Sequence, residues 1–208
     1  MQRIAFSSEF YYIKAVDLKK LPQEDIKFPI EQNDDLVVFL KPDGTAALID
    51  KDSRIKDIAD DTFIKTKIAY YSYPLLISIF LCMIKPIKRH FYQINETIFT
   101  VRLQDIISAK LPRGERNAEN AYQWNNKKWQ ISNEAAQKRY ENLRQSMQKK
   151  GYDMKSPMFV MLNRKLGAKD QLLQGHHRIG ICKELGIKEV SITFWAAPAT
   201  TSYLKRFI

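Results

Sequence analysis

The chain has 208 residues, of which 45% are hydrophobic and 12% aromatic, and its formal net charge at pH 7 is +11. This apolar content excludes a globally disordered chain, and the length suits one large domain or one domain with a sizeable extension. The positive charge points to acidic partners such as nucleotides, DNA, anionic glycans or an anionic membrane surface, although a basic protein need not bind any polyanion.

A β-hairpin is predicted in the N-terminal half. Residues 36–40 and 45–49 are two short apolar runs, and Lys41-Pro-Asp-Gly44 stands between them. Proline, aspartate and glycine favour a tight turn, because each suits a backbone conformation that turns require. The two runs are therefore expected to pair as antiparallel strands.

An apolar segment follows at residues 69–84. It is shorter than the roughly 20 apolar residues that a membrane-spanning helix needs, and we expect it to form a buried helix. The alternative is an interfacial segment, residues 69–90, that contacts an anionic membrane through the basic side chains at its end, Lys85, Lys88 and Arg89.

The cysteines and the N-terminal residues indicate the cellular compartment of the protein. Cys82 and Cys182 both stand inside apolar patterns, so we expect buried free thiols, which suit a reducing cytoplasm. Residues 1–9 lack the apolar core of a signal peptide. We therefore expect a cytoplasmic protein, with a peripheral position at the inner face of the membrane as the alternative.

The C-terminal half is predicted to alternate strands and helices. Residues 99–103 read as a strand, and a helix is expected to begin after Ser132 or Asn133 and to end at Gly151. Residues 156–161 form the next predicted strand. The apolar residues of the helix recur at steps of four, three and four: Ala136, Tyr140, Leu143 and Met147.

The most informative stretch is residues 171–190, which read as an apolar strand, a glycine turn and a helix that opens with two histidines and an arginine. The N-terminus of a helix carries about half a positive charge and several unpaired N–H groups, so it favours anions. A guanidinium group adds a planar fork that fits phosphate. The stretch therefore predicts a phosphate site formed by Gly175, His176, His177 and Arg178.

Other chemistry fits this stretch less well. One of the two histidines could instead cap the helix or pack in the core, and Arg178 could pair with Glu184 or another carboxylate on the surface. Adjacent histidines diverge by about 100° on a helix, so they do not form a zinc site. No Gly-x-Ser-x-Gly nucleophile elbow is present, and Cys182 falls on the apolar side of the predicted helix.

An ordered set of segments resembles the nucleotide-binding core of the ParB/sulfiredoxin superfamily. These segments are Tyr140–Met147, Ser156–Met161, Gly175–Arg178, Lys183–Ile187 and Val190–Trp195. The resemblance spans about residues 98–196. It implies an α/β (α+β) domain at residues 96–208, preceded by a β-containing region at residues 1–95 that packs against it.

Two branches of the superfamily fit poorly. The sulfiredoxin branch has a catalytic cysteine where this chain has His176, so a sulfinic acid reductase is not expected. The partitioning branch binds a nucleoside triphosphate through a Gly-x-Arg-Arg stretch, of which this chain keeps Arg178 and replaces the other arginine by His177. Residues 196–208 are too few for a helix-turn-helix domain, so a centromere-clamp role is not expected.

The motif Gln174-Gly-His-His-Arg178 is most similar to the Asp-Gly-His-His-Arg motif of the free serine kinases, with glutamine in place of the leading aspartate. Those kinases use a loop carboxylate as general base, which places Glu115 first and Glu119 second among the candidates here. His177 joins them as a catalytic candidate. The resemblance thus implies a phosphotransferase that uses ATP or ADP, with or without Mg²⁺, on a hydroxyl of a small metabolite or glycan. The alternative is a non-enzymatic nucleotide- or DNA-binding module.

Overall fold

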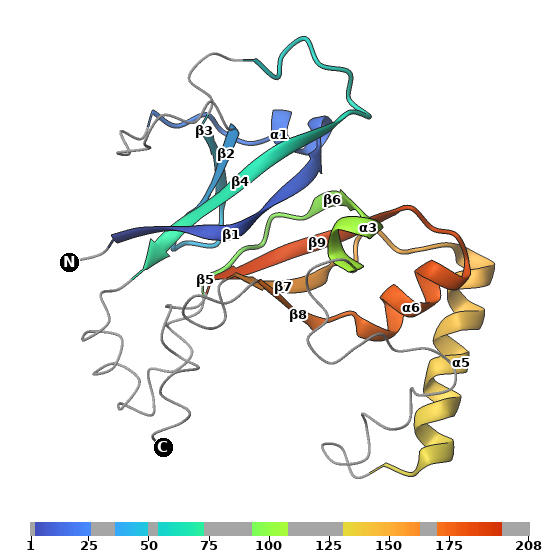
Figure 1. Cartoon of the computed structure of the whole chain (residues 1–208). Coiled ribbons are helices and arrows are strands. Elements are labelled where there is room, and N and C mark those ends of the chain that lie inside the picture. The colour runs from blue at the N-terminus through green and yellow to red at the C-terminus, as the bar shows by residue number, and fades with distance from the viewer. Residues whose placement is uncertain are drawn as a thin grey trace, which may run out of the picture.

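The structure is a computed structural model that describes residues 3–25, 36–49, 54–72, 93–107, 131–162 and 170–196. The strands in these ranges are β1 (Arg3–Lys14), β2 (Leu36–Leu40), β3 (Ala46–Ile49), β4 (Phe63–Ser72), β5 (Gln93–Ile94), β6 (Phe99–Arg102), β7 (Met158–Leu162), β8 (Gln171–Gln174) and β9 (Glu189–Ala196). The helices are α1 (Ala15–Lys19), α3 (Leu103–Ile107), α5 (Asn133–Lys150) and α6 (His176–Glu184). This mixture of elements confirms the α/β (α+β) fold class (Figure 1).

The described strands form one mixed sheet. Eight of them follow the order β3-β2-β4-β1-β6-β9-β7-β8, and β5 pairs with β9. The pairs β2–β4 and β7–β9 are parallel, and the other pairs are antiparallel. β1 joins the two halves, because it pairs with β4 along its length and with β6 at Ile13 and Val101. One sheet thus runs through both predicted regions, and the boundary at residues 95 and 96 stays a prediction.

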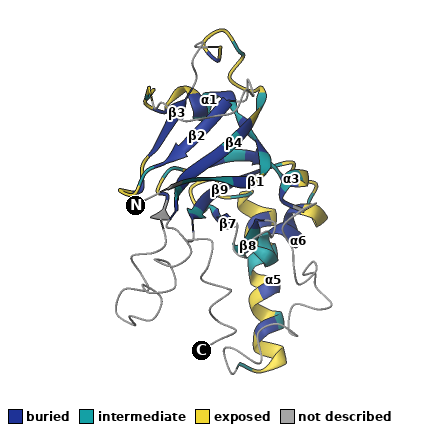
Figure 2. Cartoon of the chain, turned by 60° about the vertical axis from the view of Figure 1, so that its left-hand side comes forward, coloured by how far each residue is buried: buried dark blue, intermediate teal, exposed yellow. Residues whose placement is uncertain are grey.

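The main hydrophobic core runs through both halves of the sheet, from Val38 and Ile68 of the N-terminal strands to Phe194 of β9. Phe194 of β9 contacts Tyr11 edge-on at 4.7 Å between ring centroids and lies 5.6 Å from Phe99. Figure 1 shows α3, α5 and α6 gathered beside β6, β7, β8 and β9. Buried and exposed residues alternate along α5 in Figure 2, and its buried side chains include Tyr140 and Met147. Removal of these apolar groups from water is the main force that holds the layers together.

Two local predictions are confirmed. Residues 36–40 and 46–49 pair as an antiparallel hairpin, and its turn closes with a 2.9 Å bond from the Lys41 N–H to the carbonyl oxygen of Thr45. The predicted helix is α5, whose first turn is capped by the Ser132 hydroxyl oxygen, which accepts from the N–H of Ala135 at 3.2 Å. Both features depend on residues that are close in sequence.

The helix predicted at residues 69–84 is wrong for its first four residues. Residues 69–72 form the end of β4, where Ala69 lies opposite Phe6 and Ser72 lies opposite Arg3 on β1. The period of two in β4, with buried Thr66, Ile68 and Tyr70, continues to Ser72 and places residues 69–72 in the strand. Residues 73–84 lie outside the described residues. Across the described ranges, no helix is both long and apolar enough to cross a membrane.

Candidate phosphate-binding site

The predicted strand, glycine turn and helix are confirmed as β8, Gly175 and α6. Gly175 has a left-handed φ of 110° and precedes the first residue of α6, and its carbonyl oxygen accepts the N–H of Ile179 at 2.9 Å. Gly175 provides no side chain to cap the helix. Gly186, with φ of 69°, follows the helix as predicted. The backbone therefore brings the positive end of the α6 dipole to the carboxyl end of β8.

Close packing against β7 makes a glycine necessary at position 175. A Cβ atom placed on this residue would lie 2.7 Å from Cγ and 2.9 Å from Cβ of Met158. These distances are far shorter than a normal carbon–carbon contact. Gly175 thus meets two demands at once, a left-handed backbone and an approach that leaves no room for a side chain.

Arg178 is bound to the segment that leads into β7. Its Nη1 atom donates to the carbonyl oxygen of Ser156 and lies 3.3 Å from the Ser156 hydroxyl, and its Nη2 atom donates to the carbonyl oxygen of Pro157 at 3.0 Å. A guanidinium group has five N–H donors, so these contacts leave some of them for another acceptor. Arg178 therefore ties α6 to β7 and still brings a positive charge to the start of α6.

Glu184, which we considered as a partner for Arg178, has other partners. It accepts a hydrogen bond from the Tyr140 hydroxyl at 2.8 Å and pairs with Arg144 at 3.1 Å. Burial and the hydrogen bond to Glu184 raise the pKa of Tyr140. The hydrogen bond to Glu184 and the nearby Glu141 raise the pKa of Arg144. This cluster fastens α5 to the last turn of α6.

The two histidines occupy the first turn of α6, and both are half-buried. The ring of His177 meets the ring of Tyr140 edge-on, with 5.6 Å between centroids and an angle of 86°. His177 is thus directed at α5 and contributes to helix packing, which is the alternative left open for one histidine. His176, one helical step away, points in a direction about 100° from it. His176 is accordingly the stronger candidate to contact a ligand.

The predicted base cannot be placed beside these groups. Glu115 and Glu119 lie outside the described residues, so their approach to Gly175, His176 and Arg178 stays a prediction. Among the residues that the structure describes, no three His, Cys, Asp or Glu side chains gather as metal ligands. Cys182 is a buried free thiol, as predicted, and burial raises its pKa to about 12. A thiol of this kind remains protonated at neutral pH and does not serve as a nucleophile.

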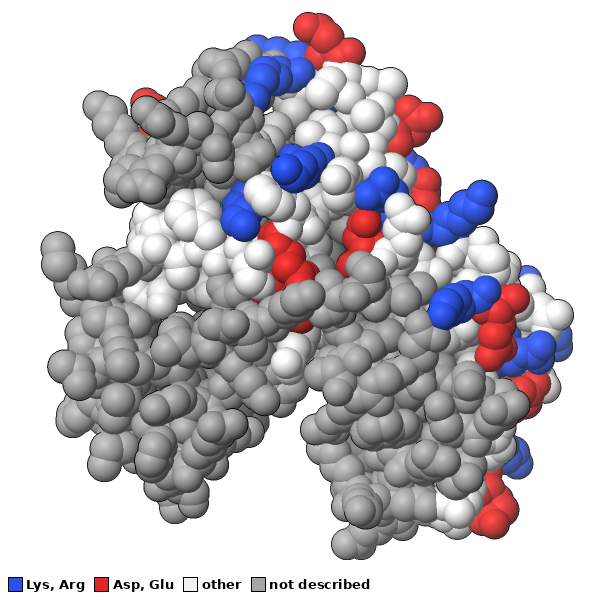
Figure 3. Space-filling model, in the orientation of Figure 1, with Lys and Arg blue, Asp and Glu red and all other residues white. Residues whose placement is uncertain are grey.

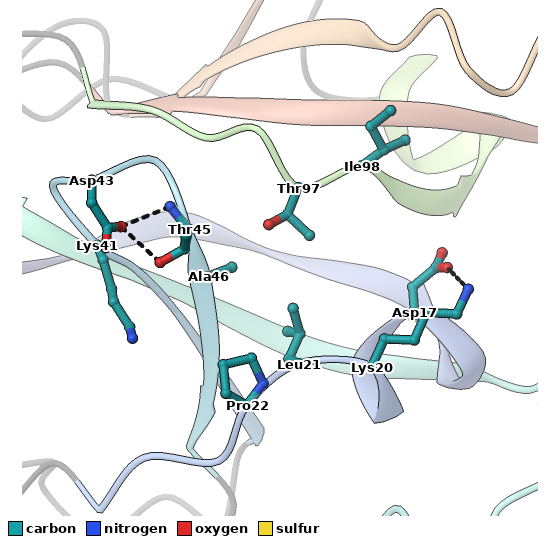
Figure 4. A pocket seen from close by; sticks show the side chains of 10 residues that line it. All are labelled: Asp17, Lys20, Leu21, Pro22, Lys41, Asp43, Thr45, Ala46, Thr97 and Ile98. Atoms are coloured by element: carbon teal, nitrogen blue, oxygen red, sulfur yellow. Dashed lines mark hydrogen bonds and ion pairs between the residues drawn. The ribbon is translucent and has the colours of Figure 1, made fainter.

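A separate pocket of about 590 Å³ lies between α1, the β2–β3 turn and the segment that enters β6 (Figure 4). Its charged groups already have partners within the protein. Asp43 accepts from the N–H and the hydroxyl of Thr45, which lowers the pKa of Asp43, and Asp17 lies 3.6 Å from Lys20. Such pairs stabilise the turns that surround the pocket, so the start of α6 is the better candidate site.

Sequence reasoning did not find the partners of the motif. Met158, which excludes a side chain at residue 175, and the carbonyl groups of Ser156 and Pro157 lie about 20 residues earlier in the chain. The strand that contains Met158 was predicted, with a proline before it. No local pattern, however, indicates which helix that strand will meet.

No protein-family model matches the chain, and no curated protein matches it. A solved structure described as a Pnob8-like ParB-N domain is similar to 56% of this chain, at 19% sequence identity and a TM-score of 0.32, and the match covers 35% of that chain. At this TM-score the similarity carries no argument about the site. The fold class rests on the described strands and helices, and the kinase branch of the superfamily stays a prediction.

Proposed function

We propose that this protein binds a nucleotide through its phosphates at the start of α6 and transfers a phosphoryl group from it to a hydroxyl group of a small metabolite or glycan. The observation that carries the proposal is the turn at Gly175. There a left-handed residue leads directly into α6, and no side chain caps the helix. The first N–H groups of a helix have no partner within the helix, and phosphate is a ligand class that they favour.

Two side chains add to this backbone site. His176 is half-buried in the first turn of α6, where it can donate a hydrogen bond to a phosphate oxygen. Arg178 is held in place by Ser156 and Pro157, so its charge is positioned before a ligand arrives. A cation that is already ordered loses little conformational freedom on binding, which favours affinity.

The proposed reaction is a direct displacement at phosphorus. The acceptor oxygen forms a bond to the terminal phosphorus of the nucleotide, while the bond from that phosphorus to its bridging oxygen breaks. The hydroxyl proton passes to Glu115 or, failing that, to Glu119. ATP would leave as ADP, and ADP would leave as AMP. Mg²⁺ bound with the nucleotide would need one or two further carboxylates.

A nucleotide- or DNA-binding module without turnover is the second candidate. One observation favours it: the helix start with no side-chain cap and the Arg178 side chain held beside it are suited to binding phosphate, and binding alone requires no carboxylate base. In such a module the bound nucleotide would stabilise one conformation and would not be consumed.

Nucleotide binding is tested first by thermal unfolding with ATP, ADP, CTP and GTP, each with and without Mg²⁺. A ligand at about 100 times its dissociation constant stabilises the folded state by about 2.7 kcal/mol, which shifts the melting temperature measurably. His176→Ala should weaken this shift. Lys183→Ala, a matched control in the last turn of the same helix, should leave it unchanged. Absence of a shift with every nucleotide would remove the phosphotransferase and the nucleotide-binding module, and would leave DNA binding as the remaining form of the second candidate.

Turnover is tested separately, by phosphorus NMR of the bound nucleotide with a panel of hydroxyl compounds and sugars. Glu115→Gln or Glu119→Gln should stop product formation and leave nucleotide affinity intact, because the base acts on the acceptor. Binding without turnover in the wild-type protein would support the second candidate. Loss of affinity in the glutamine variants would contradict the assigned role.

A further inference from the structure

Aromatic and basic side chains alternate across β1 and β4. Three cross-strand pairs, every second one along the register, each combine one ring with one lysine: Phe10 with Lys67, Tyr12 with Lys65, and Lys14 with Phe63. Residues two apart on a strand point to the same face, so these six side chains share one side of the sheet. We name this set, together with Arg102 of β6, the aromatic–basic surface.

The cations of the aromatic–basic surface lie over its rings. The Nζ atoms of Lys65 and Lys67 are 3.9 Å and 4.4 Å from the centroid of the Phe10 ring. Arg102 places its Cζ atom 3.9 Å from the centroid of the Tyr12 ring. Such contacts hold the rings and the charges in fixed relative positions.

The same strands are apolar farther along this face. Ala69 and Tyr71 of β4 continue the line of Phe63, Lys65 and Lys67, and they pack in a small cluster with Phe6 of β1 and Phe39 of β2. That cluster has a buried centre, since Ala69 is 0% and Phe39 2% exposed. The pairing of β1 with β4 shifts between Phe6 and Phe10. Beyond this irregularity the rings of the aromatic–basic surface are half-buried and reach solvent.

Two cations of the surface have carboxylate partners among the described residues. Lys14 pairs with Glu189 at 2.7 Å, and Arg102 pairs with Asp105 at 2.9 Å. Lys65 is exposed beside the Phe10 ring. Lys65 thus adds an exposed positive charge to the surface, beside the cations that Glu189 and Asp105 hold.

A pocket of about 620 Å³ extends the surface. It begins at Phe63 and Arg102 and continues to Lys183 and Lys188 near the end of α6. The described face seen in Figure 3 mixes basic and acidic side chains. Surface charge alone therefore does not single out one region as the binding site for an anionic ligand. What distinguishes the aromatic–basic surface is the regular pairing of rings with cations, followed by a pocket that carries further lysines.

We propose that the aromatic–basic surface binds single-stranded nucleic acid. Unpaired bases stack on aromatic rings, at about 1–3 kcal/mol per base, while lysines and arginines neutralise the backbone phosphates. A duplex hides the faces of its bases, and a lipid headgroup layer offers no flat rings to stack. From Phe10 to Lys14 the strand spans about 13 Å, so the surface suits a short run of extended nucleotides. The proposal uses none of the residues at the start of α6 and stands apart from the proposed phosphotransferase.

Binding is measured by fluorescence anisotropy with labelled single strands of about 15 thymidines or uridines, at about 50 and 200 mM salt. Lys65→Gln with Lys67→Gln should weaken binding at least about tenfold and reduce the slope of log affinity against log salt by about 1.4. Lys149→Gln with Lys150→Gln removes the same charge from exposed positions of α5 and should change the affinity less than about twofold. Lys65→Arg with Lys67→Arg should bind like the wild type.

The rings are tested at Phe10. Phe10→Leu should weaken binding of the single strand by about 5- to 100-fold. Phe10→Tyr keeps an aromatic ring and should bind like the wild type. Thermal unfolding of each variant checks that the fold is retained. A duplex of the same sequence should bind more weakly, and excess ATP should not compete. The proposal is overturned by any of three results: no binding of single strands by the wild-type protein, equal losses in the α5 control, or binding only to vesicles that contain phosphatidylserine.

Discussion

The Tyr11 hydroxyl donates a 2.5 Å hydrogen bond to Oδ2 of Asp170, and both residues are fully buried. Tyr11 lies in β1, and Asp170 is the residue immediately before β8, so the bond joins the N-terminal region to the strand that leads to Gly175. Ser8 lies 3.5 Å from the other carboxylate oxygen. A buried carboxylate depends on such partners, because its desolvation is costly.

Tyr11→Phe is therefore expected to lower the free energy of unfolding by about 1–3 kcal/mol, since it leaves Asp170 without its closest donor. Asp170→Asn should also destabilise the protein. Urea unfolding of both single variants and the double variant completes a mutant cycle. The two effects should be strongly non-additive. Additive losses would show that the two side chains do not depend on each other.

Gly175→Ala is expected to destabilise the protein by about 2–4 kcal/mol, from the left-handed backbone and from overlap with Met158. Gly186→Ala is the matched control, because Gly186 is also left-handed but has nothing within 4 Å of an added Cβ. It should cost about 1–2 kcal/mol. In a Met158→Ala background the cost at position 175 should fall towards that of the control. An equal cost at both glycines in the wild type would contradict the packing role.

Arg178→Ala is expected to lower stability in the absence of any ligand, by about 1–3 kcal/mol, since the carbonyl groups of Ser156 and Pro157 lose a charged donor. Arg178→Lys keeps the charge but cannot span both carbonyls, and it should recover only part of the loss. Thermal unfolding without nucleotide checks this. If Arg178→Ala is as stable as the wild type, the residue serves the ligand alone.

The free energy of unfolding is expected to fall as pH rises above about 9. Burial raises the pKa of Cys182 to about 12, and burial raises the pKa values of Tyr11 and Tyr152 as well. A raised folded pKa means that the unfolded chain releases its proton first, so stability is complete below the ordinary thiol and phenol values and declines above them. Each group contributes a slope of up to about 1.4 kcal/mol per pH unit.

Urea unfolding from about pH 8 to about pH 11 measures this decline. Cys182→Ala should flatten its early part, because the thiol ionises at the lowest pH of the three in the unfolded chain. Tyr11→Phe should flatten its later part. A decline that is identical in the wild type and both variants would assign the pH dependence to other groups.

The sequence predicted an element correctly where the interactions that form it join residues close together in the chain. The β2–β3 hairpin follows from its Pro-Asp-Gly turn, and α5 follows from Ser132 and Gly151 at its ends. The order of β8, Gly175 and α6 was also predicted. Residues 69–72 were assigned wrongly to a helix, because an apolar run alone does not distinguish a buried helix from a buried strand.

The sequence by itself determined these local elements and the concentration of phosphate-binding residue types around Gly175, since caps, turns and periodicity act over a few residues. Only the tertiary structure decided that Arg178 binds Ser156 and Pro157, that His177 packs on Tyr140, and that aromatic residues of β1 lie opposite lysines of β4. These are contacts between distant segments. They depend on strand register and on which layers meet, and both are set by the burial of the whole core.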